Sequence, residues 1–123
     1  MPVKVPGFLL KRLYVKGSLK NTGNGFALTL KNSLGAGYAQ GMLPLTIDGE
    51  PMPLAESFFY LDGKPSPFTQ VTKDAPFTLG LNREICMAVE GRALTTGVHK
   101  VGIGFTVVGL GDLSFEVVDE VKG

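Results

Sequence analysis

The chain has 123 residues, of which 44% are hydrophobic and 19% charged, a composition typical of a globular domain rather than a disordered or fibrous chain. Twelve Lys and Arg residues balance eleven Asp and Glu without forming a block of either sign, so the sequence does not favour nucleic-acid binding. The 17 glycine and 8 proline residues exclude long helices. We expect one domain over residues 1–123.

Residues 1–7 lack the apolar stretch of a signal peptide, and no window reaches the length of a membrane span. The single cysteine, Cys86, cannot form an internal disulfide, whereas small secreted domains tend to carry paired cysteines. These features predict a cytoplasmic protein with no membrane contact.

Apolar residues recur at every second position along most of the chain, which is the period of a strand with one buried face. In one such run, Phe26, Leu28 and Leu30 share a face. The pattern predicts strands over residues 14–19, 26–32, 43–47, 50–52, 57–61, 85–90, 97–108 and 112–119. Residues 33–42 and 62–76 are expected to be loops.

Tight turns are expected where glycine follows a residue that tolerates positive φ, or where glycines cluster. These places are Asn24-Gly25, Asp48-Gly49, Asp62-Gly63 and residues 109–111. About eight to ten short strands joined by such turns predict an all-β fold, an antiparallel β-sandwich with little or no helix.

The strand over residues 97–108 has one face with almost no side chains, because Gly102 and Gly104 both lie on it. Glycines weaken a strand unless another backbone or a partner surface approaches closely, or a bulge bends the strand. The two glycines therefore indicate a close approach or an interface.

His99 is the only histidine, and it shares its face with Val101, Ile103 and Phe105. We expect it at the edge of the core with its ring bonded to backbone. The alternative is a catalytic role in which His99 reaches a partner's active site, where an ordinary pKa near 6.5 suits acid–base work. One histidine and one cysteine do not make a metal site, and no base is predicted beside Cys86.

Three aromatic residues, Phe58, Phe59 and Tyr60, follow one another on a strand, so both of its faces carry an aromatic ring. One face belongs to the core. Phe59 is either covered by the proline-rich segment 65–76 or part of an exposed apolar patch of the kind found at interfaces.

Residues 17–21, 25–26, 45–50, Leu94 and 97–99 occur in an order that resembles the small β subunit of bacterial C-glycoside deglycosidases. That family has roughly this length and a β-sandwich fold. Ala39-Gln40 stands after Tyr38, where the family tends to have an arginine. The resemblance implies a lyase complex of carbohydrate metabolism, in which this chain packs against a larger TIM-barrel α subunit. That subunit would hold a divalent metal and cleave the carbon–carbon bond between a 3-keto sugar and an aromatic aglycone.

On this reading the chain holds no cofactor or metal and is not catalytic alone, with His99 as the candidate catalytic residue of the complex. The expected interface or ligand-binding residues are Tyr38, Gln40, Phe59, Gly102 and Gly104. Two alternatives stay open. One is a free-standing carbohydrate- or polyphenol-binding module that uses Tyr38 and the aromatic strand, and the other is a homo-oligomeric structural β protein.

Overall fold

A computed structural model describes residues 10–32, 37–61, 63–72, 74, 77–79, 83–107 and 111–122. Within them the chain forms eleven strands in two sheets and three short 3-10 turns. The turns are η1 (Lys11–Leu13), η2 (Leu54–Glu56) and η3 (Phe68–Gln70). The all-β prediction is therefore confirmed, with slightly more strands than expected. In this part of the chain no helix is long and apolar enough to cross a membrane.

The first sheet has five antiparallel strands in the order β1-β2-β9-β6-β7. Their bounds are β1 (Lys20–Asn21), β2 (Gly25–Lys31), β9 (Glu84–Glu90), β6 (Ser57–Leu61) and β7 (Lys64–Pro67). The two longest strands, β2 and β9, lie side by side at its centre.

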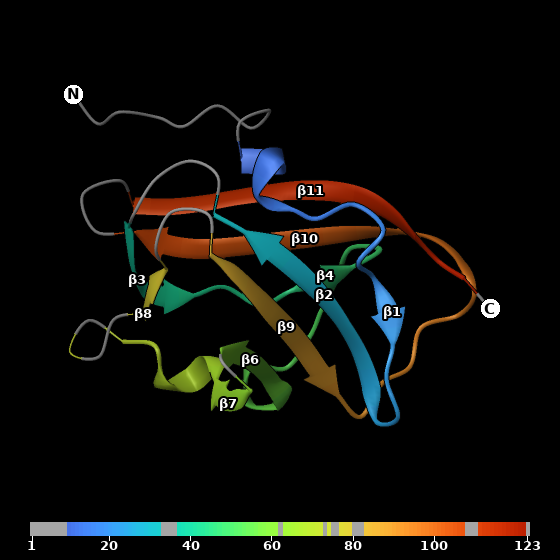
Figure 1. Cartoon of the computed structure of the whole chain (residues 1–123), viewed down its shortest axis with the longest axis horizontal. Helices are drawn as coiled ribbons and strands as arrows, with labels where there is room; N and C mark the ends of the chain where they lie inside the picture. The colour runs from blue at the N-terminus through green and yellow to red at the C-terminus, as the bar shows by residue number, and fades with distance from the viewer. Residues whose placement is uncertain are drawn as a thin grey trace.

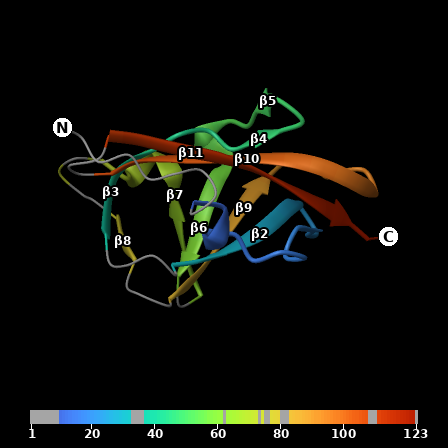
Figure 2. The same ribbon diagram turned by 90° about the horizontal axis from the view of Figure 1, so that it is seen from above.

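The second sheet is organised around β10 (Gly97–Val107), which pairs along its whole length with β11 (Gly111–Val121). On its other edge β10 pairs first with β4 (Thr46–Ile47) and then with β3 (Gly37–Met42). The outer strands are β5 (Glu50–Pro51) and β8 (Phe77–Leu79). In Figure 1, β2 and β9 cross β10 and β11 obliquely, and Figure 2 shows the two layers from above.

The core lies between the sheets and follows the alternation in the sequence. On β2, Phe26, Leu28 and Leu30 are all buried, and they face the interior as predicted. Burial of such side chains supplies most of the favourable free energy of folding. The largest fully buried side chains are Phe26, Phe59, Phe68, Leu28, Leu45, Ile85, Ile103, Val89 and Val101.

The predicted strand over residues 14–19 is wrong, because the strand begins only at Lys20. Tyr14 makes a single bridge to Leu30, and Gly17 then takes a positive φ of 85°. The backbone N–H groups of Gly17 and Leu19 donate to a side-chain carboxylate on β11 rather than to a neighbouring strand. A tertiary contact therefore overrides the local strand pattern.

The two predicted loops contain strands. In segment 33–42, β3 pairs with β10 and β8 despite its glycines. In segment 62–76, β7 includes Pro65 and Pro67, which lack an N–H donor. Proline is tolerated there because β7 is the last strand of its sheet.

The turn predictions hold at Asp48-Gly49 and at the two later hairpins, whereas at Asn24-Gly25 neither residue has a positive φ and Gly25 already belongs to β2. Asp48 and Gly49 both have positive φ, 52° and 87°, which matches a type I′ turn between β4 and β5. Gly63, with a φ of 80°, joins β6 to β7, while Asp62 lies outside the described residues. The β10–β11 hairpin is confirmed by its pairing, and residues 108–110 of its turn also lie outside the described residues.

Candidate functional site

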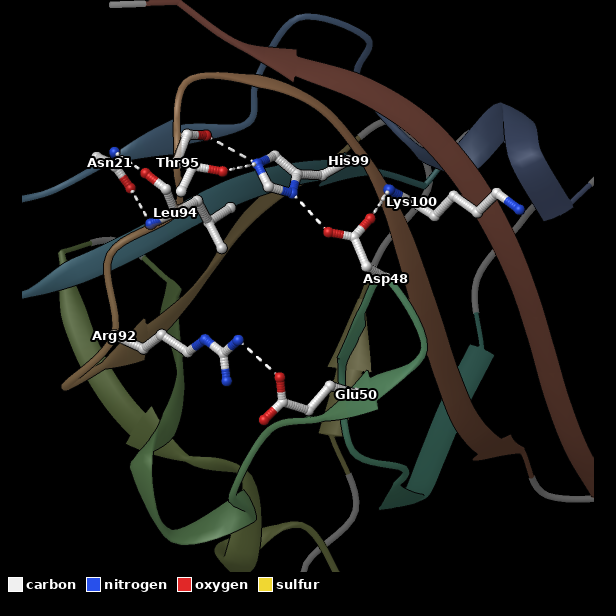
Figure 3. Close-up of polar contacts among 8 residues, drawn as sticks. All are labelled: Asn21, Asp48, Glu50, Arg92, Leu94, Thr95, His99 and Lys100. Atoms are coloured by element: carbon white, nitrogen blue, oxygen red, sulfur yellow. Dashed lines mark hydrogen bonds and ion pairs between the residues drawn. The ribbon is translucent and has the colours of Figure 1, made fainter.

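His99 lies on the inner face at the start of β10 and is 8% exposed. Its Nδ1 atom is 2.8 Å from Asp48 Oδ2 in the β4–β5 turn. Its Nε2 atom is 2.8 Å from the carbonyl oxygen of Thr95 and 3.3 Å from the hydroxyl of the same residue. Figure 3 shows the ring held between Asp48 in the β4–β5 turn and Thr95 in the segment that precedes β10. The expectation of a core-edge residue bonded to backbone is confirmed.

The partners of His99 determine its protonation. A carboxylate and a carbonyl oxygen only accept hydrogen bonds, so both are satisfied together only when both ring nitrogens donate, as they do in the imidazolium. The Thr95 hydroxyl, at the longer distance of 3.3 Å, is the one contact that can donate to a neutral Nε2. The Thr95 backbone contact and the Asp48 contact raise the pKa of His99 above its ordinary value of 6.5. Neither nitrogen is left free to take up a proton from a substrate.

Asp48 connects the turn to β10 through several atoms. Its backbone N–H donates to the carbonyl of Lys100 at 2.8 Å, and its Oδ1 accepts the Lys100 backbone N–H at 2.9 Å. The Lys100 N–H and the contact with His99 hold the pKa of Asp48 below its usual value. The Asp-Gly turn is visible in the sequence, but nothing there links Asp48 to His99.

The crossover segment, residues 91–96, joins β9 of the first sheet to β10 of the second. The side-chain amide of Asn21 donates to the Leu94 carbonyl and accepts the Leu94 N–H, both at 2.8 Å. Arg92 pairs with Glu50 at 2.6 Å, with both side chains about half exposed. Together with Thr95, these contacts fix the crossover segment at three points (Figure 3).

Asp119 on β11 is a second buried polar centre, 7% exposed and directly opposite His99 in the strand register. Its Oδ2 accepts hydrogen bonds from the Tyr14 hydroxyl at 2.5 Å, the Gly17 N–H at 2.9 Å and the Leu19 N–H at 3.4 Å. Its Oδ1 accepts the N–H of the next residue at 2.8 Å. Burial alone raises the pKa of Asp119, but these hydrogen bonds outweigh it and hold the pKa below its usual value. Sequence reasoning missed this centre, which has no local signal.

The outer face of the second sheet carries an open hollow of about 390 Å³ over Gly102 and Gly104. A Cβ at Gly102 would lie 2.1 Å from the Thr46 hydroxyl oxygen, and one at Gly104 would lie 2.7 Å from Leu43 Cδ1. The close approach that these glycines indicated therefore comes from the chain itself. Their role at an interface stays a prediction.

The other predicted contact residues are not gathered at one site. Phe59 is 1% exposed and packs on Phe68 with ring centroids 4.6 Å apart, so it is covered by segment 65–76 and offers no surface to a partner. Tyr38 and Gln40 lie on β3, which pairs with β10 around Thr106. That is seven residues along β10 from His99, or roughly 23 Å.

Two further observations concern the described residues only. They contain no group of three or more His, Cys, Asp or Glu side chains placed to hold a metal ion. Cys86 is partly buried on β9, and burial raises the pKa of its thiol, which disfavours the reactive thiolate.

Residues 9–122 match the family model described as hydroxymethylglutaryl-CoA reductase, N-terminal domain. No curated protein matches the chain. Because the matched family is a different one, the resemblance to a C-glycoside deglycosidase β subunit is wrong. The predicted lyase function, TIM-barrel α subunit and C-glycoside substrate are wrong with it, and neither alternative gains support. The match includes all of the described residues, and the protein belongs to the family of hydroxymethylglutaryl-CoA reductase N-terminal domains.

Proposed function

We propose that this chain is a non-catalytic β-sandwich domain that packs against the catalytic part of a hydroxymethylglutaryl-CoA reductase. The observation that carries the proposal is the family match over residues 9–122. In this proposal the catalytic part carries the reductase activity, whether it lies on the same polypeptide as this domain or on a separate one.

The hydrogen bonds made by the buried polar residues His99 and Asp119 support a non-catalytic role. His99 and Asp119 are the buried groups best suited to acid–base chemistry, and each is committed to the fold. Both nitrogens of His99 face acceptors, and Asp119 is occupied by four donors. A catalytic base needs a lone pair within reach of the substrate proton.

The outer face of β10 and β11 is the docking surface in this proposal. Val98 and Val118 are the large hydrophobic side chains exposed there, at 65% and 55%, within the described residues. The register pairs Lys100 with Val118 and Val98 with Glu120, so the two valines are diagonal neighbours on one face. The hollow over Gly102 continues the same face. The two exposed valines, flanked on this face by Lys100 and Glu120, and the hollow beside them are the surface that this proposal gives to the partner.

The test is binding of the chain to the reductase catalytic part from the same genome, measured by calorimetry together with turnover of hydroxymethylglutaryl-CoA. The chain alone should give no turnover. The double variant Val98→Asp, Val118→Asp should bind at least tenfold more weakly, since two charges would enter an apolar contact. Ser66→Asp, at an exposed position on β7 of the other sheet, is the matched control and should bind like the natural chain.

Turnover by the chain alone would overturn the non-catalytic role. Absence of any binding would overturn the partnership. If the double variant and the control bind equally well, the chain does bind the reductase but not through the outer face of β10 and β11. We also propose that the chain holds no cofactor of its own and is cytoplasmic, the latter supported by its single unpaired cysteine.

A further inference from the structure

The contacts of His99 join two elements that are far apart in the sequence. Through Asp48 the ring contacts the β4–β5 turn, and through Thr95 it contacts the crossover segment. A neutral imidazole has one N–H, so it satisfies one of these oxygens and turns a lone pair toward the other. We infer that His99 is a pH-sensitive clamp: charged, it holds Thr95 of the crossover segment to the Asp48 turn, and deprotonation breaks one of these two contacts.

The surroundings of the ring favour its charged form. Asp48 approaches from the turn, and Asp119 stands opposite His99 on β11. Lys100, the next residue on β10, donates its backbone N–H to Asp48, so the same carboxylate serves both residues. Tyr14, bonded to Asp119, and the exposed pair Arg92 and Glu50 also lie at this end of the sandwich, and Glu120 follows Asp119 on β11.

The direction of the pH effect follows from proton linkage. The folded pKa of His99 lies above the value of 6.5 that it has when unfolded. Its stabilising contribution is therefore complete below pH 6.5 and is lost as the pH rises through the folded pKa. Between these two values, the folding equilibrium constant falls by at most tenfold per pH unit for this one proton.

Asp48→Asn is an isosteric variant that keeps the hydrogen bonds of His99 but removes the need for the ring to be charged. The asparagine oxygen can still accept the Lys100 N–H, while its amide N–H can donate to Nδ1 of a neutral ring. The ring then keeps its Nε2–H for the Thr95 carbonyl, so all contacts are satisfied without a charge. Asparagine also tolerates the positive φ at this turn position.

The experiment measures urea unfolding of the natural chain and of Asp48→Asn at intervals from pH 5.5 to 8.0. The ratio of their folding equilibrium constants should fall as the pH rises, by up to tenfold per unit. Loosening of the crossover segment at Thr95 is measured in parallel as the rate of trypsin cleavage after Arg92, whose side chain is 45% exposed. As the pH rises, cleavage should accelerate more in the natural chain than in the variant. Comparing the two proteins at each pH also corrects for the pH dependence of trypsin itself.

A ratio that stays constant from pH 5.5 to 8.0 would overturn the clamp, as would equal acceleration of cleavage in both proteins. If Asp48→Asn does not fold, His99→Gln replaces it, since glutamine does not titrate in this range. The same fall in the ratio then supports the inference, and the same constancy rejects it.

Discussion

At the scale of single residues, Asp119 illustrates how this fold accommodates a buried charge. Its carboxylate is surrounded by donors: one phenol and three backbone N–H groups. Hydrogen bonds from several N–H groups stabilise the ionised form, which lets the carboxylate stay charged at 7% exposure. The contact also fixes the N-terminal segment from Tyr14 to Leu19 on β11.

Tyr14→Phe should destabilise the chain by about 1–3 kcal/mol, because it removes a donor from a buried charged acceptor. The measurement is the free energy of unfolding in urea at pH 7. Tyr60→Phe, at a half-buried position on β6, is the matched control and should cost less. Equal losses for the two variants would show that the Asp119 contact contributes little.

At the scale of elements, glycines let neighbouring segments approach more closely than any side chain permits. Gly25 begins β2 opposite Glu90 on β9, and a Cβ there would lie only 1.9 Å from the Val89 carbonyl oxygen. Gly102 meets the short side chain of Thr46 instead. The obstacle is fixed backbone in the first case and a side chain in the second, so the two sites should respond differently to alanine.

Gly25→Ala should cost about 3 kcal/mol or more, since β2 and β9 must move apart at the centre of the first sheet. Gly23→Ala is the matched control, because a Cβ there meets nothing within 4 Å. Urea unfolding of both variants gives the comparison. A loss at Gly25 no larger than at Gly23 would contradict the close packing of these strands.

Gly102→Ala should cost about 1–3 kcal/mol through overpacking against Thr46. The double variant Thr46→Ala, Gly102→Ala removes the hydroxyl oxygen at 2.1 Å, leaving Thr46 Cβ at an ordinary 3.4 Å. A double-mutant cycle in urea should therefore show a favourable coupling of at least about 0.5 kcal/mol. If the losses of the two single variants simply add, contact with Thr46 is not the reason that position 102 is a glycine.

At the scale of the whole molecule, two long central pairs carry the fold, β2 with β9 and β10 with β11, while β1, β5 and β7 are short outer strands. Local opening is easiest where few buried contacts resist it. Amide hydrogen exchange should therefore be slowest in β9 and β10 and fastest in β1 and β5. Equal protection of these outer strands would contradict this distribution of stability.

The sequence predicts those parts of the molecule that depend on neighbouring residues. Alternation reveals the buried faces of β2, β9 and β10, and the Asp48-Gly49 turn follows from its own chemistry. The polar cross-links were missed because their partners lie 51 residues apart for Asp48 and His99 and 105 apart for Tyr14 and Asp119. The mistaken resemblance rested on short stretches that contribute residues to these cross-links, namely residues 17–21, 45–50 and 97–99.

The protonation of the single histidine is the measurement that bears most directly on the role of His99, because its two ring nitrogens face acceptor oxygens of Asp48 and Thr95. Nitrogen-15 NMR of the natural chain at pH 6.5 reports each ring nitrogen of His99 without overlap from another histidine. We predict two protonated nitrogens in most molecules, and a midpoint of titration above 6.5. A neutral ring with one unprotonated nitrogen as the main form at this pH would contradict this prediction and return His99 to the candidates for acid–base chemistry.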